Sequence, residues 1–187
     1  NLSQLIELEP NEKVCGAVSV GQNSLANDLF FVTKNGMVKK TPLSEYRSRR
    51  KLKAIKLKEG DSIVSAFPTN GYKLVAIGTS LGNCLVTSVK TINPTGRNTI
   101  GVLGIKLPKN SYVVSARPIM ESTQYILTLT RQGYGKLTKL EEYVPQNRNT
   151  VGHKTIALSN GDSLVSCLPV EGNEELTIIS THNQLKI

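Results

Sequence analysis

The chain has 187 residues and a formal net charge of +9, which leaves room for a substantial core and favours a polyanionic partner. Its composition, with 39% hydrophobic residues, 15 glycines and 8 prolines, excludes a disordered or collagen-like protein. Its apolar runs are all shorter than the roughly 18 residues that a membrane-spanning helix needs. The cysteines are too widely spaced to predict a zinc site or a disulfide framework, and we expect small core residues at Cys15, Cys84 and Cys167.

In chain order, the first repeated element is an apolar triplet, a polar turn and a short strand that ends in a small residue. The element begins near the N-terminus and returns three times. Its closing residues are spaced by 49, 50 and 51 positions, and they are Ala17, Ala66, Ala116 and Cys167. This constant register predicts an internal repeat of about 50 residues.

A β-hairpin is the second repeated element. Each copy has an apolar strand, a short turn and a second strand, and the first strands cover residues 29–33, 74–77, 126–129 and 176–179. The turns are Asn35-Gly36, Leu81-Gly82, Gln132-Gly133 and His182-Asn183. Asn-Gly is the strongest short hairpin signal, and it predicts a two-residue loop in which both central residues have positive φ.

Each unit therefore carries about four short strands and no segment with the pattern of an amphipathic helix. Repeats of this length made only of strands are typical of blades arranged around an axis. We predict an all-β, propeller-like array of four-stranded blades in one domain that spans residues 1–187. Its blades cover about 25–70, 71–121 and 122–172, with partial blades at 1–24 and 173–187. Because the chain starts without Met and inside a unit, we expect a fragment with unpaired strand edges.

A cationic motif, Arg-Asn-Thr-x-Gly, occurs twice between a hairpin and the next apolar triplet. Its copies lie 51 residues apart, within Gly96–Gly101 and Asn147–Gly152. In the first unit the same slot holds the basic run Arg47–Lys53, whereas acidic residues cluster near the two ends of the chain. If the units stack, the basic loops lie along one rim of the molecule.

A rim of Arg and Lys suits duplex DNA, because cations that neutralise phosphates release condensed counterions and can bend DNA without reading its bases. The Asn and Thr of the motif can donate hydrogen bonds to phosphates, and its glycine lets the backbone approach closely. Alternatively, Arg97 and Arg148 are structural and tie each loop to the neighbouring unit, and Arg47–Lys53 is a solvated loop. The candidate DNA-binding residues are Lys39, Lys40, Arg47, Arg49, Arg50, Lys51, Lys53, Arg97, Asn98, Lys136, Lys139, Arg148, Asn149 and Lys154.

Three segments carry a resemblance to a known family. Val32–Thr41, Gly96–Ile105 and Gln132–Lys136 resemble blades of the C-terminal domain found in the A subunit of bacterial DNA gyrase, and the similarity extends over essentially the whole chain. The related domain in the A subunit of topoisomerase IV is the nearest rival. Gly133-Tyr134-Gly135-Lys136 and the Arg-Asn-Thr-x-Gly loops favour gyrase.

The resemblance implies a β-pinwheel, in which neighbouring blades exchange a strand and double-stranded DNA wraps around the basic rim. It also implies a bacterial cytoplasmic, nucleoid-associated protein that works with the rest of the gyrase A subunit, and with the B subunit, in ATP-dependent negative supercoiling. The family's Gln-Arg-Arg-Gly-Gly-Lys-Gly-type box is absent, and Gln146–Gly152 keeps only its Gln, one Arg and the last Gly. We therefore expect either a box upstream of Asn1 or a rim that contacts DNA without wrapping it fully.

The sequence shows no catalytic constellation. His153 and His182 lack metal-ligand spacing, and no phosphate-binding Gly-x-x-x-x-Gly-Lys sequence occurs. Tyr46 and Tyr143, at equivalent places in two units, are expected to be packing residues. We predict a chain that is not an enzyme by itself and that uses no cofactor, metal or membrane.

Three other functions stay open at this point. The first is a topoisomerase IV domain that presents DNA crossings for decatenation. The second is a propeller-type scaffold for protein interactions, in which the positive charge serves solubility or an acidic partner. The third is a propeller enzyme for carbohydrates or small molecules, which ranks last because the repeated loops offer Arg, Asn and Lys rather than carboxylates.

Overall fold

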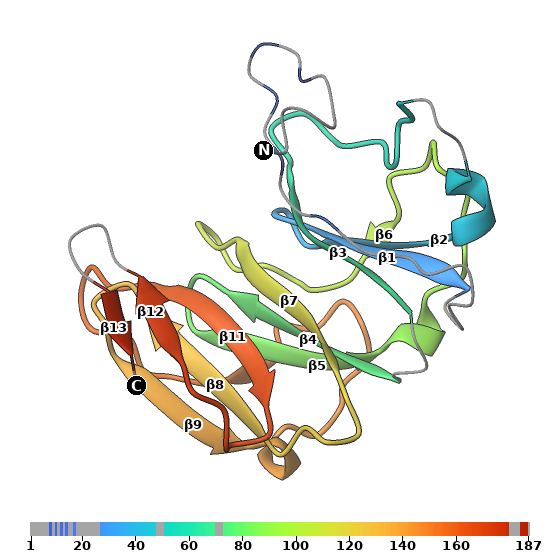
Figure 1. Ribbon diagram of the computed structural model, residues 1–187. Coiled ribbons are helices and arrows are strands. Elements are labelled where there is room, and N and C mark those ends of the chain that lie inside the picture. The colour runs from blue at the N-terminus through green and yellow to red at the C-terminus, as the bar shows by residue number, and fades with distance from the viewer. Residues whose placement is uncertain are drawn as a thin grey trace.

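The structure, a computed structural model, describes residues 27–47, 51–69, 73–179 and 184–186, together with Leu8, Pro10, Glu12, Val14 and Ala17. Three sheets of similar build lie in a curved row (Figure 1). Within the described residues the helices are three short 3₁₀ turns at equivalent places, namely η2 (Leu43–Tyr46), η3 (Val89–Thr91) and η4 (Leu140–Glu142). The predicted all-β repeat is confirmed, and most of the expected partial blade at 1–24 lies outside the described residues.

The first sheet contains a strand from the second unit. Its own strands are β1 (Asp28–Thr33), β2 (Met37–Pro42) and β3 (Ile63–Pro68), and the sheet order is β3-β1-β2-β6. Strand β6 (Val102–Leu103) follows the second hairpin in sequence, yet it pairs antiparallel with β2. The strand exchange that the resemblance implied is therefore present.

The second sheet repeats this arrangement, with the order β10-β5-β4-β7. Its own strands are β4 (Leu74–Thr79), β5 (Asn83–Ser88) and β7 (Val113–Ile119), and β10 (His153–Lys154) comes from the third unit and pairs with β5. The second unit thus gives one strand to its predecessor and receives one from its successor.

The third sheet has the order β11-β8-β9 and is formed by β8 (Tyr125–Thr130), β9 (Gly135–Lys139) and β11 (Leu164–Val170). Among the described residues, no strand pairs with the outer edge of β9. A further hairpin, β12 (Thr177–Ile179) and β13 (Gln184–Lys186), follows; its expected turn at His182-Asn183 lies outside the described residues.

The hairpin turns differ from the prediction. Strand β1 ends at Thr33 and β2 begins at Met37, so the loop has three residues, and only Gly36, at φ 80°, has a positive φ in it. The reason is a side-chain bond, because the Thr33 hydroxyl accepts a hydrogen bond from the Met37 amide at 3.1 Å. Thr79 and Thr130 accept the equivalent bonds in the other two hairpins. The predicted two-residue loop is wrong, although each hairpin is where the sequence placed it.

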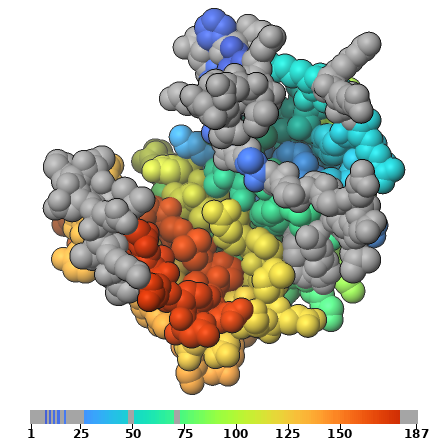
Figure 2. Space-filling view, viewed as in Figure 1, coloured from blue at the N-terminus to red at the C-terminus, as the bar shows by residue number. Residues whose placement is uncertain are grey.

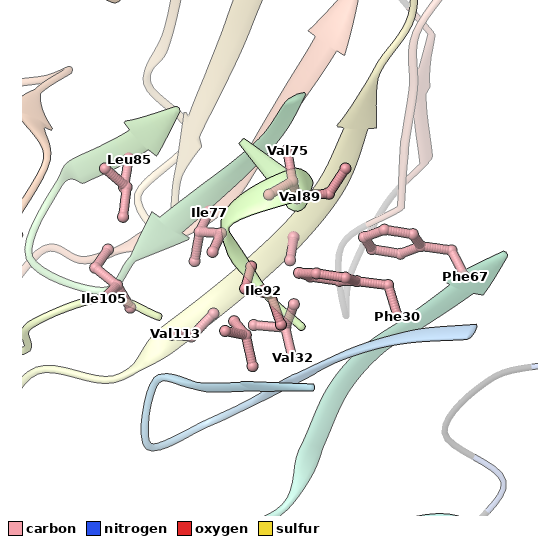
Figure 3. Packing of buried hydrophobic residues seen from close by; sticks show 12 residues of the cluster. Phe30, Val32, Phe67, Val75, Ile77, Leu85, Val89, Ile92, Ile105 and Val113 are labelled. Carbon is pink, nitrogen blue, oxygen red and sulfur yellow. The ribbon is translucent and has the colours of Figure 1, made fainter. Parts of the chain in front are cut away.

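Apolar clusters fill the two junctions between the units. Phe30 and Val32 of the first unit pack with Val75, Ile77 and other residues of the second (Figure 3). Ala76 belongs to the cluster between the second and third units. Strand β4 is therefore buried on both faces, which explains its continuous apolar run. The third unit lies directly against the second in the space-filling view (Figure 2).

Two of the cysteines meet at the second junction. Cys84 and Cys167 are both fully buried, and their sulfur atoms lie 3.1 Å apart as free thiols. A side chain on Gly78 would collide with the Cβ of Cys167, so the glycine provides room for this contact. The expectation of small core residues is confirmed for these two cysteines, and Cys15 lies outside the described residues.

Candidate nucleic-acid interface

Each Arg-Asn-Thr motif lies in a loop that rests on the second hairpin strand of the preceding unit, β2 for the first motif and β5 for the second. We call residues 95–101 the first rim loop and residues 146–152 the second rim loop. The amide of Thr95 donates to the carbonyl of Lys40, and Gln146 donates in the same way to Val86. The two loops therefore occupy equivalent places on successive sheets.

The threonine of the motif closes its own loop. The hydroxyl of Thr99 donates to the Gly96 carbonyl at 2.9 Å. The hydroxyl of Thr150 lies 2.8 Å from Oε1 of Gln146 and 3.1 Å from the Asn147 carbonyl. These hydroxyls thus shape the rim loops, whereas Asn98 and Asn149 are exposed at the loop tips.

The glycine of the motif serves packing between units. Gly101 has φ 89°, and a Cβ there would lie 2.3 Å from the carbonyl oxygen of Val38. Gly152 has φ 80° and approaches the Cys84 carbonyl in the same way. The close backbone approach predicted for this glycine exists, but it is made to the preceding sheet.

The two motif arginines tie their loops to the preceding unit. We call residues 51–57 the first linker and residues 102–107 the second linker. Arg97 Nη1 donates to the Lys53 carbonyl at 3.1 Å, and Arg148 Nη1 donates to the Leu103 carbonyl at 3.2 Å. This geometry is that of the structural alternative raised from the sequence. Arg148 is nevertheless exposed, so its guanidinium keeps donors that face solvent.

Lys39 is not the surface cation that the sequence suggested. Its side chain is only 1% exposed, and its ammonium donates to the carbonyls of Ala54 and Arg97 at 3.1 and 2.7 Å. Burial lowers the pKa of Lys39, and the negative charge of Glu45 partly offsets this effect. Lys39 shares a face of β2 with buried Met37 and Thr41, opposite the face of Val38, and the burial of this second face was overlooked in the sequence analysis. We therefore remove Lys39 from the set of candidate DNA contacts.

Most of the other candidates do lie on the surface. Lys40 is half-buried, with its ammonium 3.4 Å from the Val89 carbonyl. Two exposed lysines lie near carboxylates, Lys51 at 2.8 Å from Glu12 and Lys139 at 3.6 Å from Glu141, and such pairs exchange readily for phosphate. The exposed basic candidates are Arg47, Lys51, Lys53, Lys136, Lys139, Arg148 and Lys154, and Arg49 and Arg50 lie outside the described residues.

The structure adds two lysines that the sequence analysis missed. Lys56 and Lys106 are exposed at equivalent positions of the two linkers. Their amides donate to the carbonyls of Thr99 and Thr150 at 3.1 and 2.9 Å, so each lysine lies beside a rim loop. The signal was present in the sequence, because each lysine follows a buried isoleucine in an extended segment and must point the opposite way.

Tyr143 and His153, the other side chains considered for a chemical role, have hydrogen-bond partners within the protein. Tyr143 is buried, and its hydroxyl bonds to that of Thr155, which confirms it as a packing residue. The Nε2 atom of His153 lies 3.0 Å from the Val144 carbonyl. The described residues hold no cluster of metal-ligating side chains and no helix long and apolar enough to cross a membrane.

Comparison with known proteins identifies first the fold class and then the family. The structure superimposes on the C-terminal domain of DNA topoisomerase IV with a TM-score of 0.90, at 25% identity over 100% of this chain and 59% of the other. It matches a DNA gyrase A C-terminal domain with a TM-score of 0.86, at 21% identity over 100% of this chain and 64% of the other. These are β-pinwheel domains of type II topoisomerases. The chain belongs to the DNA gyrase C-terminal domain, β-propeller family, whose model matches residues 27–70, 73–120 and 124–171.

Full-length relatives support the same family. The chain is 34% identical over 192 residues to the A subunit of DNA gyrase from Kosmotoga olearia, covering 100% of this chain and 24% of that protein. It is 39% identical over 151 residues to the A subunit of DNA gyrase from Helicobacter pylori (strain ATCC 700392 / 26695), covering 79% of this chain and 18% of that protein. The chain thus spans about a quarter or less of these curated relatives.

Proposed function

We propose that this chain is the DNA-binding and DNA-wrapping domain of a gyrase A subunit. The observation that carries the proposal is the repetition of rim loop and linker at equivalent places on successive sheets, each with exposed Asn and Lys side chains. A duplex that follows these loops meets a phosphate-binding patch at each unit. Family membership supports the same function.

The mechanism rests on phosphate neutralisation and on the curved row of units. Lys56, Lys106 and Arg148 point charge outward, and each phosphate that they neutralise releases condensed counterions. Arg97 and Arg148 each donate one Nη1 hydrogen bond to a backbone carbonyl, and their other N–H groups can reach phosphates, which carry no sequence information. Binding is therefore tolerant of DNA sequence, and the curved row of units favours a bent duplex.

Catalysis would belong to other parts of the enzyme. In this proposal the chain itself performs no chemical step and acts in the bacterial cytoplasm with the rest of the A subunit, and with the B subunit. The holoenzyme would use the wrapped segment for ATP-dependent supercoiling.

The test is binding to relaxed circular DNA over a series of salt concentrations, followed by relaxation with a type I topoisomerase and a topoisomer gel. We expect the logarithm of affinity to fall linearly with the logarithm of salt, with a slope of about 0.9 per neutralised phosphate. A shift in linking number that grows with protein concentration shows wrapping. Salt-independent binding, or none, contradicts the proposal.

A matched pair of charge deletions locates the interface. Lys106→Gln should lower the salt slope by about 1, because it removes one phosphate contact. Arg117→Gln removes the same charge from an exposed position on β7, away from the rim loops, and should leave the slope unchanged. Equal effects from both variants would indicate that binding depends on net charge alone.

A topoisomerase IV domain is the second candidate, favoured by the TM-score of 0.90 to such a domain. The gel separates the two candidates. A shift in linking number of the sign that supports negative supercoiling favours gyrase. Binding without a shift favours a domain that presents crossings, or a gyrase-type rim without its box.

A further inference from the structure

The buried ammonium of Lys39 lies between the first linker and the first rim loop. It donates to Ala54 of the linker at 3.1 Å and to Arg97 of the rim loop at 2.7 Å. Between these two contacts, the Lys56 amide donates to the Thr99 carbonyl. Lys39 therefore spans the place where the linker and the rim loop lie side by side.

The peptide of Arg97 is held from several directions. Its carbonyl accepts from Lys39, its amide donates to Glu45 Oε2 at 2.9 Å, and its guanidinium donates to Lys53. These partners come from β2, η2 and the first linker. The first rim loop is thus fixed by charged groups of the preceding unit.

The second rim loop has no equivalent of this cation among the described residues. The residue equivalent to Lys39 in the second hairpin is Leu85, which is also fully buried but has no side-chain donor. The second rim loop keeps the guanidinium bond of Arg148 and the backbone bond from Asn149 to Gly104. Leu85 packs instead in the apolar cluster between the first and second units, which includes Ile105 of the second linker.

We propose that Lys39 is a positioning residue that pins the first rim loop to the first linker and so sets Lys56 and Asn98 in place for contact with phosphate. The inference rests on the proposed DNA binding. Its physical basis is that a buried ammonium must keep its carbonyl partners, since leaving either charge or carbonyl unpaired is costly. The ammonium therefore holds both segments in one geometry, whereas Leu85 has no donor that could join the second linker to the second rim loop.

The first test is amide hydrogen exchange of Lys39→Leu, which places the residue of the second unit in the first. We expect exchange in residues 96–101 to rise by about tenfold or more, as local opening becomes easier. Exchange in residues 147–152 should not change, and this loop reports in the same sample that the variant is folded. Lys40→Leu, on the opposite face of β2, is the control and should leave both loops protected. Unchanged exchange in residues 96–101 of Lys39→Leu overturns the proposal.

The second test is a double-mutant cycle on DNA affinity at fixed salt. In the otherwise unchanged chain, Lys56→Gln should weaken binding by about three- to tenfold, as the loss of one phosphate contact does. In the Lys39→Leu background, Lys56→Gln should have almost no further effect, because the contact has already been lost. Lys106→Gln should cost the same in both backgrounds.

The outcomes separate the inference from the proposed function. If Lys56→Gln has the same effect in both backgrounds, Lys39 does not position the loop for DNA. If the unchanged chain does not bind DNA, the proposed function fails, and with it the part of the inference that concerns phosphate. Hydrogen exchange still decides in that case whether Lys39 pins the loop.

Discussion

At the scale of single residues, the glycine of the Arg-Asn-Thr motif is required for two reasons, its positive φ and the lack of space for a Cβ atom. Gly101 combines φ 89° with a place where a Cβ would meet the Val38 carbonyl, whereas Gly60 has φ 70° and open space. We expect Gly101→Ala to lower the free energy of unfolding by about 2–5 kcal/mol, from left-handed strain and overpacking together. Gly60→Ala should cost about 1–2 kcal/mol, from strain alone. Urea unfolding of the two variants checks this, and equal losses would contradict the steric contribution.

Tyr143 gives a prediction about pH. Desolvation by burial raises the pKa of its phenol, and the bond to Thr155 only partly opposes this. An acid whose folded pKa is raised contributes stability below its unfolded pKa, near 10, and that contribution is lost as the pH rises through the folded value. Stability should therefore fall less steeply above about pH 10 in Tyr143→Phe than in the unchanged chain. Thermal melts of both proteins at neutral and alkaline pH measure the difference, and parallel curves would refute it.

At the scale of elements, strand β4 contributes side chains to both apolar clusters, because both of its faces are covered. We expect Ile77→Ala to lower the free energy of unfolding by about 2–5 kcal/mol, since it opens a cavity at the first junction. Leu81→Ala, in the exposed turn that follows, should change it by less than about 0.5 kcal/mol. Denaturant titrations test the pair, and a small loss for Ile77→Ala would mean that the junction relaxes around the cavity.

The elements also show what could be predicted from the sequence. Alternation and Asn-Gly located the hairpins, because both signals are local. The longer turns were missed because the threonine that closes each of them acts through its side chain. The donated strands are only two residues long, β6 and β10, and their partners lie one unit back. No local pattern indicates such pairing, and only the resemblance to a known family pointed to it.

At the scale of the whole molecule, the sequence predicted that basic loops share a rim. It could not distinguish the basic side chains that are free to contact DNA from those that bind backbone carbonyls of the protein. Lys39 and Arg97 look like surface cations in sequence, and three-dimensional packing turns them toward backbone carbonyls. Lys56 and Lys106 were overlooked because they stand outside the repeated motif. The repeated motif locates the loops in the sequence, but the burial of each side chain determines which of the basic residues can contact a ligand.

The three outer strands differ in what covers them. Strands β2 and β5 receive a donated strand, whereas β9 has no partner on its outer edge among the described residues. In this chain we expect the amides of β9 to exchange with solvent before those of β2 and β5, because unpaired edge amides face water. Hydrogen exchange with peptide resolution measures the order. Equal protection of β2, β5 and β9 would show that another segment covers β9.

The donated strands also impose a schedule on synthesis. The first unit finishes its own strands at Pro68, but its sheet gains its last strand only when Leu103 has been made, 35 residues later. At elongation rates of about 5–20 residues per second, that interval is about 2–7 s. During this interval the edge of β2 that later pairs with β6 is unpaired while the chain is still on the ribosome. The first two sheets are therefore completed only after the next hairpin has been made, and a translational pause placed between two hairpins would prolong the exposure of the preceding edge.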